Sequence, residues 1–351
     1  MATNLIFYNL ISNVGKTTIS VMAADHLSKQ HKRVLLVDLD VQASATHIME
    51  VTYGKFPTDR TLRNSLNQNT LEKSIVNLDK DLDIIPSDMS ISLWEQDLRE
   101  MPKHNKDLVL TNDLASLQSN YDYIIIDVPS KPSLLVSNAV LASDYCTLIL
   151  QTQRSSYKGL LESIQYLNNL KKDYPEEARF ALAGIILFPV EPRTKAYLDV
   201  AKQAERLFGP LLLDNRIYPK NRVKYWAQHG ITYKQTNIQD RQTHRMYSLV
   251  LYELLGRIEN NNSSEILIDK SGSNSLLNQL NKKAQNEIDR HRRKNKTVKV
   301  SEDVYTTLKD LSLYSGNQIQ EIIDTLLRYG LQHEPTYSRL LQEKVNSNHL
   351  L

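Results

Sequence analysis

The chain contains very little cysteine: of its 351 residues, only Cys146 carries a thiol. A single thiol excludes a disulfide within the chain, and it fits a protein of the reducing cytoplasm. No run of 18 apolar residues occurs, so we expect no membrane-spanning helix. The first residues also lack the layout of a secretion signal, so we expect no cleaved leader. Because 41% of the residues are hydrophobic, the chain can build two domains, or one large domain with an appendage.

Glycine is missing from part of a phosphate-binding loop at residues 13–18, Asn-Val-Gly-Lys-Thr-Thr. The position five residues before Gly15 holds Leu10, and two further positions where glycine is expected hold Ser12 and Asn13. Asn13 is the less disruptive change, since asparagine tolerates left-handed backbone angles.

The core of this loop is intact. It lies between an apolar run at 5–8 and a helical pattern from 19. In such loops backbone N–H groups and the helix N-terminus bind phosphates, the lysine reaches the outer phosphates, and the following threonine binds Mg²⁺. The predicted nucleotide-binding residues are Asn13, Val14, Gly15, Lys16, Thr17 and Thr18.

Apolar runs of strand length alternate with helical patterns along the first 258 residues. The predicted strands are 5–8, 34–37, 82–85, 123–126, 146–150 and 183–187, and the predicted helices are 19–31, 107–118, 134–143, 158–172, 194–207 and 241–258. Strands that are apolar throughout indicate a parallel sheet covered on both faces. The sequence therefore predicts an α/β P-loop NTPase fold, with a mostly parallel sheet and helices on both faces.

Acidic residues follow two of these strands. Asp38 and Asp40 come after strand 34–37, and Asp127 closes strand 123–126. Ligands of open α/β sheets gather at the carboxyl ends of strands, where an acidic residue holds Mg²⁺ through water. An aspartate after a strand is also a common turn or cap residue. Together with the loop, the three carboxylates predict a nucleoside triphosphate–Mg²⁺ site.

Several segments resemble the ParA/MinD family of deviant Walker ATPases, and the plasmid-partition ParA branch in particular. They are residues 13–18, 38–46, 83–88 and 121–129, with further similarity at 192–194 and 221–230. The resemblance covers about residues 3–258 and implies ATP and Mg²⁺ as cofactors. It implies the following roles: Lys16 on the β/γ-phosphates, Thr17 on Mg²⁺, Thr18 on the α-phosphate, Asp40 on the attacking water, and Asp38 and Asp127 supporting Mg²⁺ and that water.

The sequence departs from the family at Ile11, five residues before Lys16. ParA proteins carry a second lysine there, which touches the partner's ATP across the dimer. Two basic residues of this chain, Lys131 and Arg154, are candidates to take over the role of that second lysine. Arg154 is preferred, because it follows a strand end and so could face the site, although a surface arginine without this role is an alternative.

A basic segment precedes the C-terminal region. Between residues 282 and 299 there are eight lysines and arginines against two acidic residues. Such blocks often contact nucleic acid, although a solvated helix face or linker is an alternative. We expect a flexible or helical basic linker at 259–294, whose Arg290, Arg292 and Arg293 contact phosphate. A second reading is that one of these arginines stimulates hydrolysis on a neighbouring ATPase domain.

Residues 295–333 resemble a ribbon-helix-helix domain, followed by a tail at 334–351. An alternating strand at 295–300 precedes a helix capped by Ser301, a Gly-containing turn at 315–317 and a second helix. In that fold, paired strands of a dimer enter the major groove. The resemblance implies that Lys296, Thr297 and Lys299 contact DNA and that Asn317 lies where a helix N-terminus meets phosphate. A dimerisation hairpin without a DNA role is the alternative.

Two weaker surface sites complete the prediction. Arg222 and Lys224 resemble the region of nonspecific DNA binding in ParA dimers, although incidental surface charge is nearly as good an explanation. The tail could form a short amphipathic membrane helix, but a frayed terminus is favoured.

The favoured function is a cytoplasmic, nucleoid-associated, homodimeric ATPase for plasmid or chromosome partition. Its hydrolysis is expected to be slow and stimulated by DNA or a ParB-like partner, and its C-terminal domain is expected to bind a centromere or operator. One alternative is an ATP-binding transcriptional regulator with little turnover. Another is an ATPase that positions a protein cargo.

Overall fold

The computed structural model describes residues 1–259 except 57–60, 190–193 and 235, together with 301–315 and isolated positions between 282 and 326. The chain divides into two units, Met1–Arg290 and His291–Leu351. The predicted strand 295–300 and the DNA-contact candidates Arg290, Arg292, Arg293, Lys296, Thr297, Lys299 and Asn317 lie outside the described residues.

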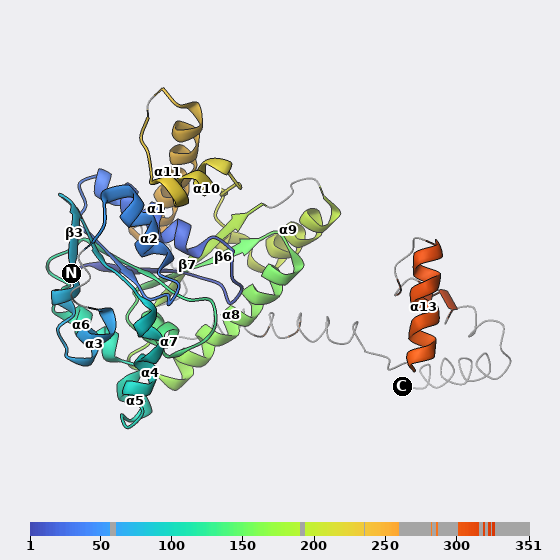
Figure 1. Ribbon diagram of the computed structural model, residues 1–351, viewed down its shortest axis with the longest axis horizontal. Coiled ribbons are helices and arrows are strands. Elements are labelled where there is room, and N and C mark those ends of the chain that lie inside the picture. Colours follow the sequence, from blue (N-terminus) through green and yellow to red (C-terminus); the bar gives the residue numbers. More distant parts are fainter. Residues whose placement is uncertain are drawn as a thin grey trace. The chain divides into compact units, whose positions relative to one another are not determined.

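A seven-stranded sheet forms the centre of the first unit (Figure 1). Its strands are β1 (Thr3–Tyr8), β2 (Val34–Asp38), β3 (Val76–Asp79), β4 (Leu82–Ile85), β5 (Tyr123–Asp127), β6 (Tyr145–Gln151) and β7 (Ala181–Phe188). The spatial order is β3-β4-β2-β5-β1-β6-β7. Every neighbouring pair is parallel except β3 and β4. The predicted fold class of the ATPase domain is therefore confirmed.

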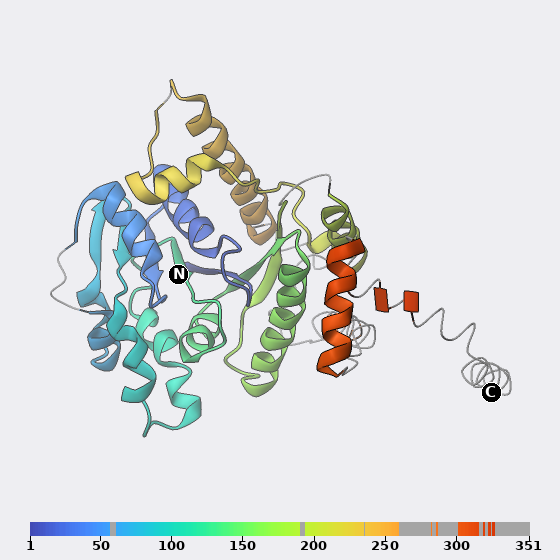
Figure 2. The ribbon, with the colours of Figure 1, turned by 45° about the vertical axis from the view of Figure 1, so that its right-hand side comes forward.

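Helices cover both faces of the sheet because both faces are apolar. Ile6 and Tyr8 of β1 belong to one buried cluster, whereas Leu5 and Phe7 belong to the other. One face packs against α1 (Lys16–Lys29), α2 (Ser44–Tyr53), α10 (Asn221–His229) and α11 (Ile238–Glu259), which lie together in Figures 1 and 2. The opposite face packs against α3 (Leu62–Asn67), α4 (Trp94–Asp97), α6 (Val109–Ala115), α7 (Leu134–Leu141), α8 (Arg154–Asp173) and α9 (Lys195–Phe208).

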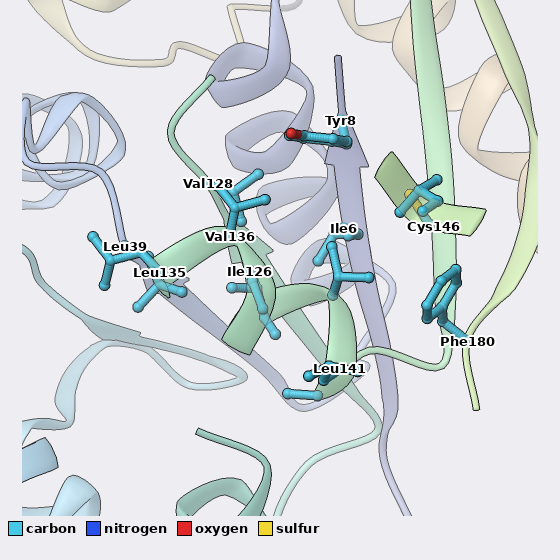
Figure 3. Close-up of a cluster of buried hydrophobic side chains, with 14 of the residues drawn as sticks. Ile6, Tyr8, Leu39, Ile126, Val128, Leu135, Val136, Leu141, Cys146 and Phe180 are labelled. Atoms are coloured by element: carbon cyan, nitrogen blue, oxygen red, sulfur yellow. The ribbon is translucent and has the colours of Figure 1, made fainter. Parts of the chain in front are cut away.

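Cys146 lies inside the second of these layers. Figure 3 shows its side chain among buried residues that include Ile6 and Phe180. Burial raises the pKa of the Cys146 thiol, because an apolar site disfavours the thiolate. The thiol therefore acts as a small core side chain.

Most predicted helices recur with shifted ends. The exception is the helix predicted at 107–118, which is confirmed only as α6 (Val109–Ala115), with a separate short helix α5 (Lys103–Lys106) before it. No described helix is long and apolar enough to cross a membrane.

In the second unit the structure describes one long helix, α13 (Glu302–Ser315). It begins where predicted, and the N–H of Tyr305 donates to the carbonyl of Ser301 at 2.9 Å. Among its apolar residues, Leu308 is buried, while Val304 and Leu311 are exposed. A helix therefore lies where the sequence predicts the first helix of the C-terminal region, and the ribbon-helix-helix domain stays a prediction.

Candidate nucleotide site

The loop after β1 has the backbone conformation that its residues predict. Asn13 has φ 60° and Gly15 has φ 96°, both in the left-handed region. The helix α1 then starts at Lys16, so its first free N–H groups face the loop. This end of a helix attracts anions, and the prediction that Asn13 replaces a glycine by adopting left-handed angles is confirmed.

Lys16 is buried, and all three of its ammonium donors are used. Its Nζ donates to the carbonyl of Asn9 at 3.2 Å, to the carbonyl of Ile11 at 3.0 Å and to Ser130 Oγ at 2.6 Å. Burial lowers the pKa of Lys16 to about 8, while the nearby Asp127 and Asp40 carboxylates oppose the shift. The loop therefore presents a positive charge that is already desolvated and positioned.

The sequence analysis did not single out Asn9 or Ser130 as site residues. Asn9 is fully buried, and its Nδ2 donates to the carbonyls of Ile149 and Ser156. Its Oδ1 accepts from the N–H of Ile11 at 2.8 Å. Asn9 thus fixes the start of the loop to β6 and α8. Its place after an apolar strand was a visible signal, but its partners come from distant parts of the chain.

Asp38 and Asp127 end the neighbouring strands β2 and β5 as direct cross-strand partners. Both are fully buried. Asp38 Oδ2 accepts from the N–H and hydroxyl of Thr46 at 2.9 and 2.8 Å, and its Oδ1 accepts from the N–H of Asp40 at 3.0 Å. The register of the sheet therefore fixes two carboxylates next to each other at the edge of the loop.

Asp127 is the less satisfied of the two carboxylates. Its Oδ1 accepts from Ser20 Oγ at 3.0 Å, whereas its Oδ2 is buried without a partner among the described residues. Burial and the Asp38 charge raise the pKa of Asp127 to about 8, against hydrogen bonds from Thr17 and Ser20. Burial also raises the pKa of Asp38. Two adjacent buried carboxylates need positive charge nearby.

The residues present fit a magnesium ion. The available donors at this edge are carboxylate and hydroxyl oxygens, which Mg²⁺ prefers over nitrogen or sulfur. The unpartnered Asp127 Oδ2 and the Thr17 side chain supply this chemistry, and Asp40 also lines the cavity.

The loop opens into a cavity of about 650 Å³, within the usual range of ligand pockets. Its walls come from the loop, the start of α1, the segment after β2 and the segment after β5. They comprise Ser12, Asn13, Gly15, Lys16, Thr17, Thr18, Asp40, Gln42, Ser44, Ile48, Pro129, Ser130 and Lys131. Among the predicted residues, Val14, Asp38 and Asp127 are buried behind this wall.

Comparison with protein-family models gives a match to an AAA domain over residues 3–180. This AAA domain covers more than half of the chain. The chain belongs to this AAA-domain family.

The chain is also similar to named proteins and to solved structures. Soj, the sporulation initiation inhibitor protein of Bacillus subtilis, is 28% identical over 231 residues, covering 63% of this chain and 86% of Soj. The chromosome-partitioning ATPase Soj of Treponema pallidum is 26% identical, covering 73% and 98%. Among solved structures, a complex of Cyanothece McdA with ATP has a TM-score of 0.62 at 21% identity, covering 73% and 96%. The predicted ParA/MinD-type ATPase domain is confirmed, and these matches say nothing of a ribbon-helix-helix.

Ile11, which replaces the second lysine, points into the AAA domain. Its side chain packs against the buried cluster that contains Leu5 and Phe7. It also lies beside Gly159 of α8, where an added Cβ would approach Ile11 Cγ1 to 2.3 Å. The position is thus part of the packing between the loop and α8. A residue with a side chain at position 159 would collide with Ile11.

The two candidate substitutes occupy different places on the AAA domain. Lys131 is exposed and lines the nucleotide cavity. Arg154 is exposed at the first position of α8 and is not one of the residues that line this cavity. Of the two candidates, only Lys131 is therefore among the residues that line the cavity.

The proposed nonspecific DNA residues on α10 also differ from each other. Arg222 forms an ion pair with the buried Asp240, and its Nη2 donates to Thr232 Oγ1 at 2.9 Å. Lys224 is exposed. Arg222 therefore holds α10 against α11, and Lys224 is the one of the two with an exposed side chain.

Proposed function

We propose that this chain is a Mg²⁺-dependent ATPase that takes part in DNA partition. The observation that carries the proposal is the pair of buried carboxylates, Asp38 and Asp127, beside the buried Lys16 and the helix N-terminus. Phosphoryl transfer depends on positioning and charge neutralisation more than on covalent chemistry. The name of one relative supports partition as the process, since Soj of Treponema pallidum is a chromosome-partitioning ATPase.

Each residue of the site has a separate task in this proposal. Backbone N–H groups of Gly15 through Thr18 hold phosphate oxygens, and Lys16 moves from its internal acceptors to the outer phosphates. Thr17 and Asp127 hold Mg²⁺, which supplies charge neutralisation. Asp40 orients the attacking water from its half-buried position, and Asp38 holds the backbone of Asp40 in place.

DNA binding and dimerisation belong to the same proposal. Lys224 contacts DNA phosphates nonspecifically, and the segment with Arg290, Arg292 and Arg293 does so near the C-terminal domain. Lys296, Thr297, Lys299 and Asn317 then form a sequence-specific reader within a ribbon-helix-helix dimer. The proposed setting is the cytoplasm, on the nucleoid, with a ParB-like protein as an additional partner.

The test is the ATPase rate of the full chain with no DNA, with random DNA, and with DNA from around its own gene. We expect a slow basal rate that DNA increases, with the own-gene fragment active at the lowest concentration. Lys16→Ala should abolish turnover in all three conditions. A rate that neither DNA raises would contradict the partition proposal and favour the regulator with little turnover, for which Ile11 is the supporting observation.

A further inference from the structure

A second cluster of metal-ligating side chains lies in the C-terminal half of α1, away from the nucleotide loop. Asp25 and His26 of α1 meet His244 of α11, and one ligand atom from each lies within 4.8 Å of the others. The helices α1, α10 and α11 lie side by side in Figures 1 and 2. Neither the proposed ATPase nor the proposed DNA contacts use these three residues.

Both imidazoles carry a buried nitrogen that has no partner. His244 Nε2 lies 2.8 Å from the carbonyl of Thr232, while its Nδ1 is buried and unpartnered among the described residues. Because only a protonated Nε2 can donate to a carbonyl, Nδ1 carries the free lone pair. His26 is 7% exposed, and its Nδ1 is likewise buried without a partner in the described part of the chain. Buried polar atoms are seldom left this way, and here there are two.

The surroundings of His244 hold its ring in one orientation. The contact from His244 Nε2 to a backbone carbonyl fixes the tautomer and the ring orientation, as in protein metal sites. His244 is further held by Trp226 and Tyr233, whose ring centroids lie 4.5 and 4.0 Å away.

Asp25 supplies a buried carboxylate with no ion pair among the described residues. It is fully buried, its Oδ1 accepts from the Tyr53 hydroxyl at 3.1 Å, and its Oδ2 accepts from the Tyr233 hydroxyl. The nearest lysine on the same helix, Lys29, pairs with Asp79 at 2.7 Å instead. Each carboxylate oxygen keeps a second lone pair after accepting one hydrogen bond. A cation at this point would compensate the buried charge.

We propose that Asp25, His26 and His244 bind one divalent transition-metal ion of the zinc type. Two imidazole nitrogens and one carboxylate oxygen suit Zn²⁺ and its neighbours, and they disfavour Mg²⁺ and Ca²⁺. With metal–ligand bonds of about 2.0–2.2 Å, tetrahedral ligand atoms lie about 3.3 Å apart. The ligand atoms, which lie within 4.8 Å of one another, therefore close by up to about 1.5 Å. A water molecule would complete the coordination.

The position of the site gives it a structural consequence. The ion joins α1, which begins with Lys16, to α11, and Trp226 of α10 packs on one of its ligands. Metal binding therefore stabilises the packing of these helices on one face of the sheet. This inference does not depend on the proposed ATPase activity.

The test uses untagged full-length protein that has been stripped with a chelator and is free of nucleotide and Mg²⁺. Zn²⁺ is titrated by competition with a chromogenic chelator, and Co²⁺ binding is followed by its visible d–d absorption. We expect one ion per chain, an intense tetrahedral-type Co²⁺ spectrum, and a Tm that rises with free Zn²⁺. Loss of a residue that only supports a metal ligand typically weakens metal affinity by about 10- to 100-fold. His26→Gln and His244→Gln each remove a ligand, so each should weaken Zn²⁺ binding by more than this.

His229→Gln is the matched control, because His229 is an exposed histidine of α10 outside the cluster. It should bind Zn²⁺ as the unmodified protein does. Undiminished binding in both His26→Gln and His244→Gln would overturn the proposal, and so would the absence of stoichiometric binding to the unmodified chain. If the variants fail to fold, the Co²⁺ spectrum of the unmodified protein decides. A weak octahedral spectrum would contradict the four-coordinate, zinc-type site proposed here.

Discussion

The contact between Ile11 and Gly159 allows a direct test of how the nucleotide loop is supported. Gly159 lies inside α8, and an added Cβ would come to 2.3 Å from Ile11 Cγ1 and 2.7 Å from Asn9 Oδ1. Asn9 cannot easily yield, because its amide is held by Ile149 and Ser156. In Gly159→Ala the clash therefore pushes on the two residues whose carbonyls hold Lys16.

Two opposing effects set the magnitude. Alanine in place of a mid-helix glycine gains about 0.8–1.0 kcal/mol from helix propensity. Overpacking a tight contact costs about 1–3 kcal/mol. We therefore expect Gly159→Ala to lower the free energy of unfolding by up to about 2 kcal/mol. Gly256→Ala in α11 is the matched control, because nothing lies within 4 Å of the added Cβ there, so that variant should gain about 0.8–1.0 kcal/mol.

The assay is urea unfolding of both variants, together with the affinity for a non-hydrolysable ATP analogue. Gly159→Ala should weaken nucleotide binding as well as stability, while Gly256→Ala leaves binding unchanged. Adding Ile11→Ala to Gly159→Ala removes the shorter of the two contacts and should restore part of both losses. Equal stability gains in Gly159→Ala and Gly256→Ala would refute the reasoning, because they would show that the loop accommodates the methyl group freely.

Three further predictions concern charge. The folded-state pKa of Asp127 lies above its unfolded value. Its contribution to the free energy of unfolding is therefore full below about pH 4 and is lost as pH rises through about 8. In denaturant unfolding without nucleotide, the free energy of unfolding of Asp127→Asn should depend less on pH than that of the unmodified protein. Lys224→Ala should reduce the slope of log affinity for random DNA against log salt concentration by about 1. In contrast, Arg222→Ala should lower the free energy of unfolding by about 3–5 kcal/mol, because it removes the ion-pair partner of the buried Asp240. Arg154→Ala should abolish ATP-dependent dimerisation in light scattering, while Lys131→Ala should weaken nucleotide binding; unchanged dimerisation in Arg154→Ala would exclude it as the substitute cation.

The sequence predicted the sheet well because its strands are buried on both faces. Continuous apolar runs such as residues 123–126 have few other structures to form. The strand β3 escaped prediction because it is a short antiparallel edge strand with an interrupted apolar pattern, Val76-Asn77-Leu78-Asp79. Helix α2 was also missed, since it directly follows the polar turn after Asp40.

The nucleotide site could be predicted only as far as its local motifs reach. The loop, Asp38 and Asp127 could be recognised from the sequence because each comes directly after an apolar run of strand length. The role of Asn9, the contact of Lys16 with Ser130 and the space beside Gly159 depend on residues that are distant in the chain. The same holds for the cluster of Asp25, His26 and His244, whose members have no motif spacing and are joined only by the packing of α1 on α11.

The cross-strand pairing of Asp38 with Asp127 should couple the binding of a divalent ion to the release of a proton. Two buried carboxylates side by side retain a proton at neutral pH when no cation is present. A divalent ion that binds Asp127 displaces this proton to the solvent. The apparent affinity for Mg²⁺ should then increase with pH, and the heat of binding should vary with the ionisation enthalpy of the buffer.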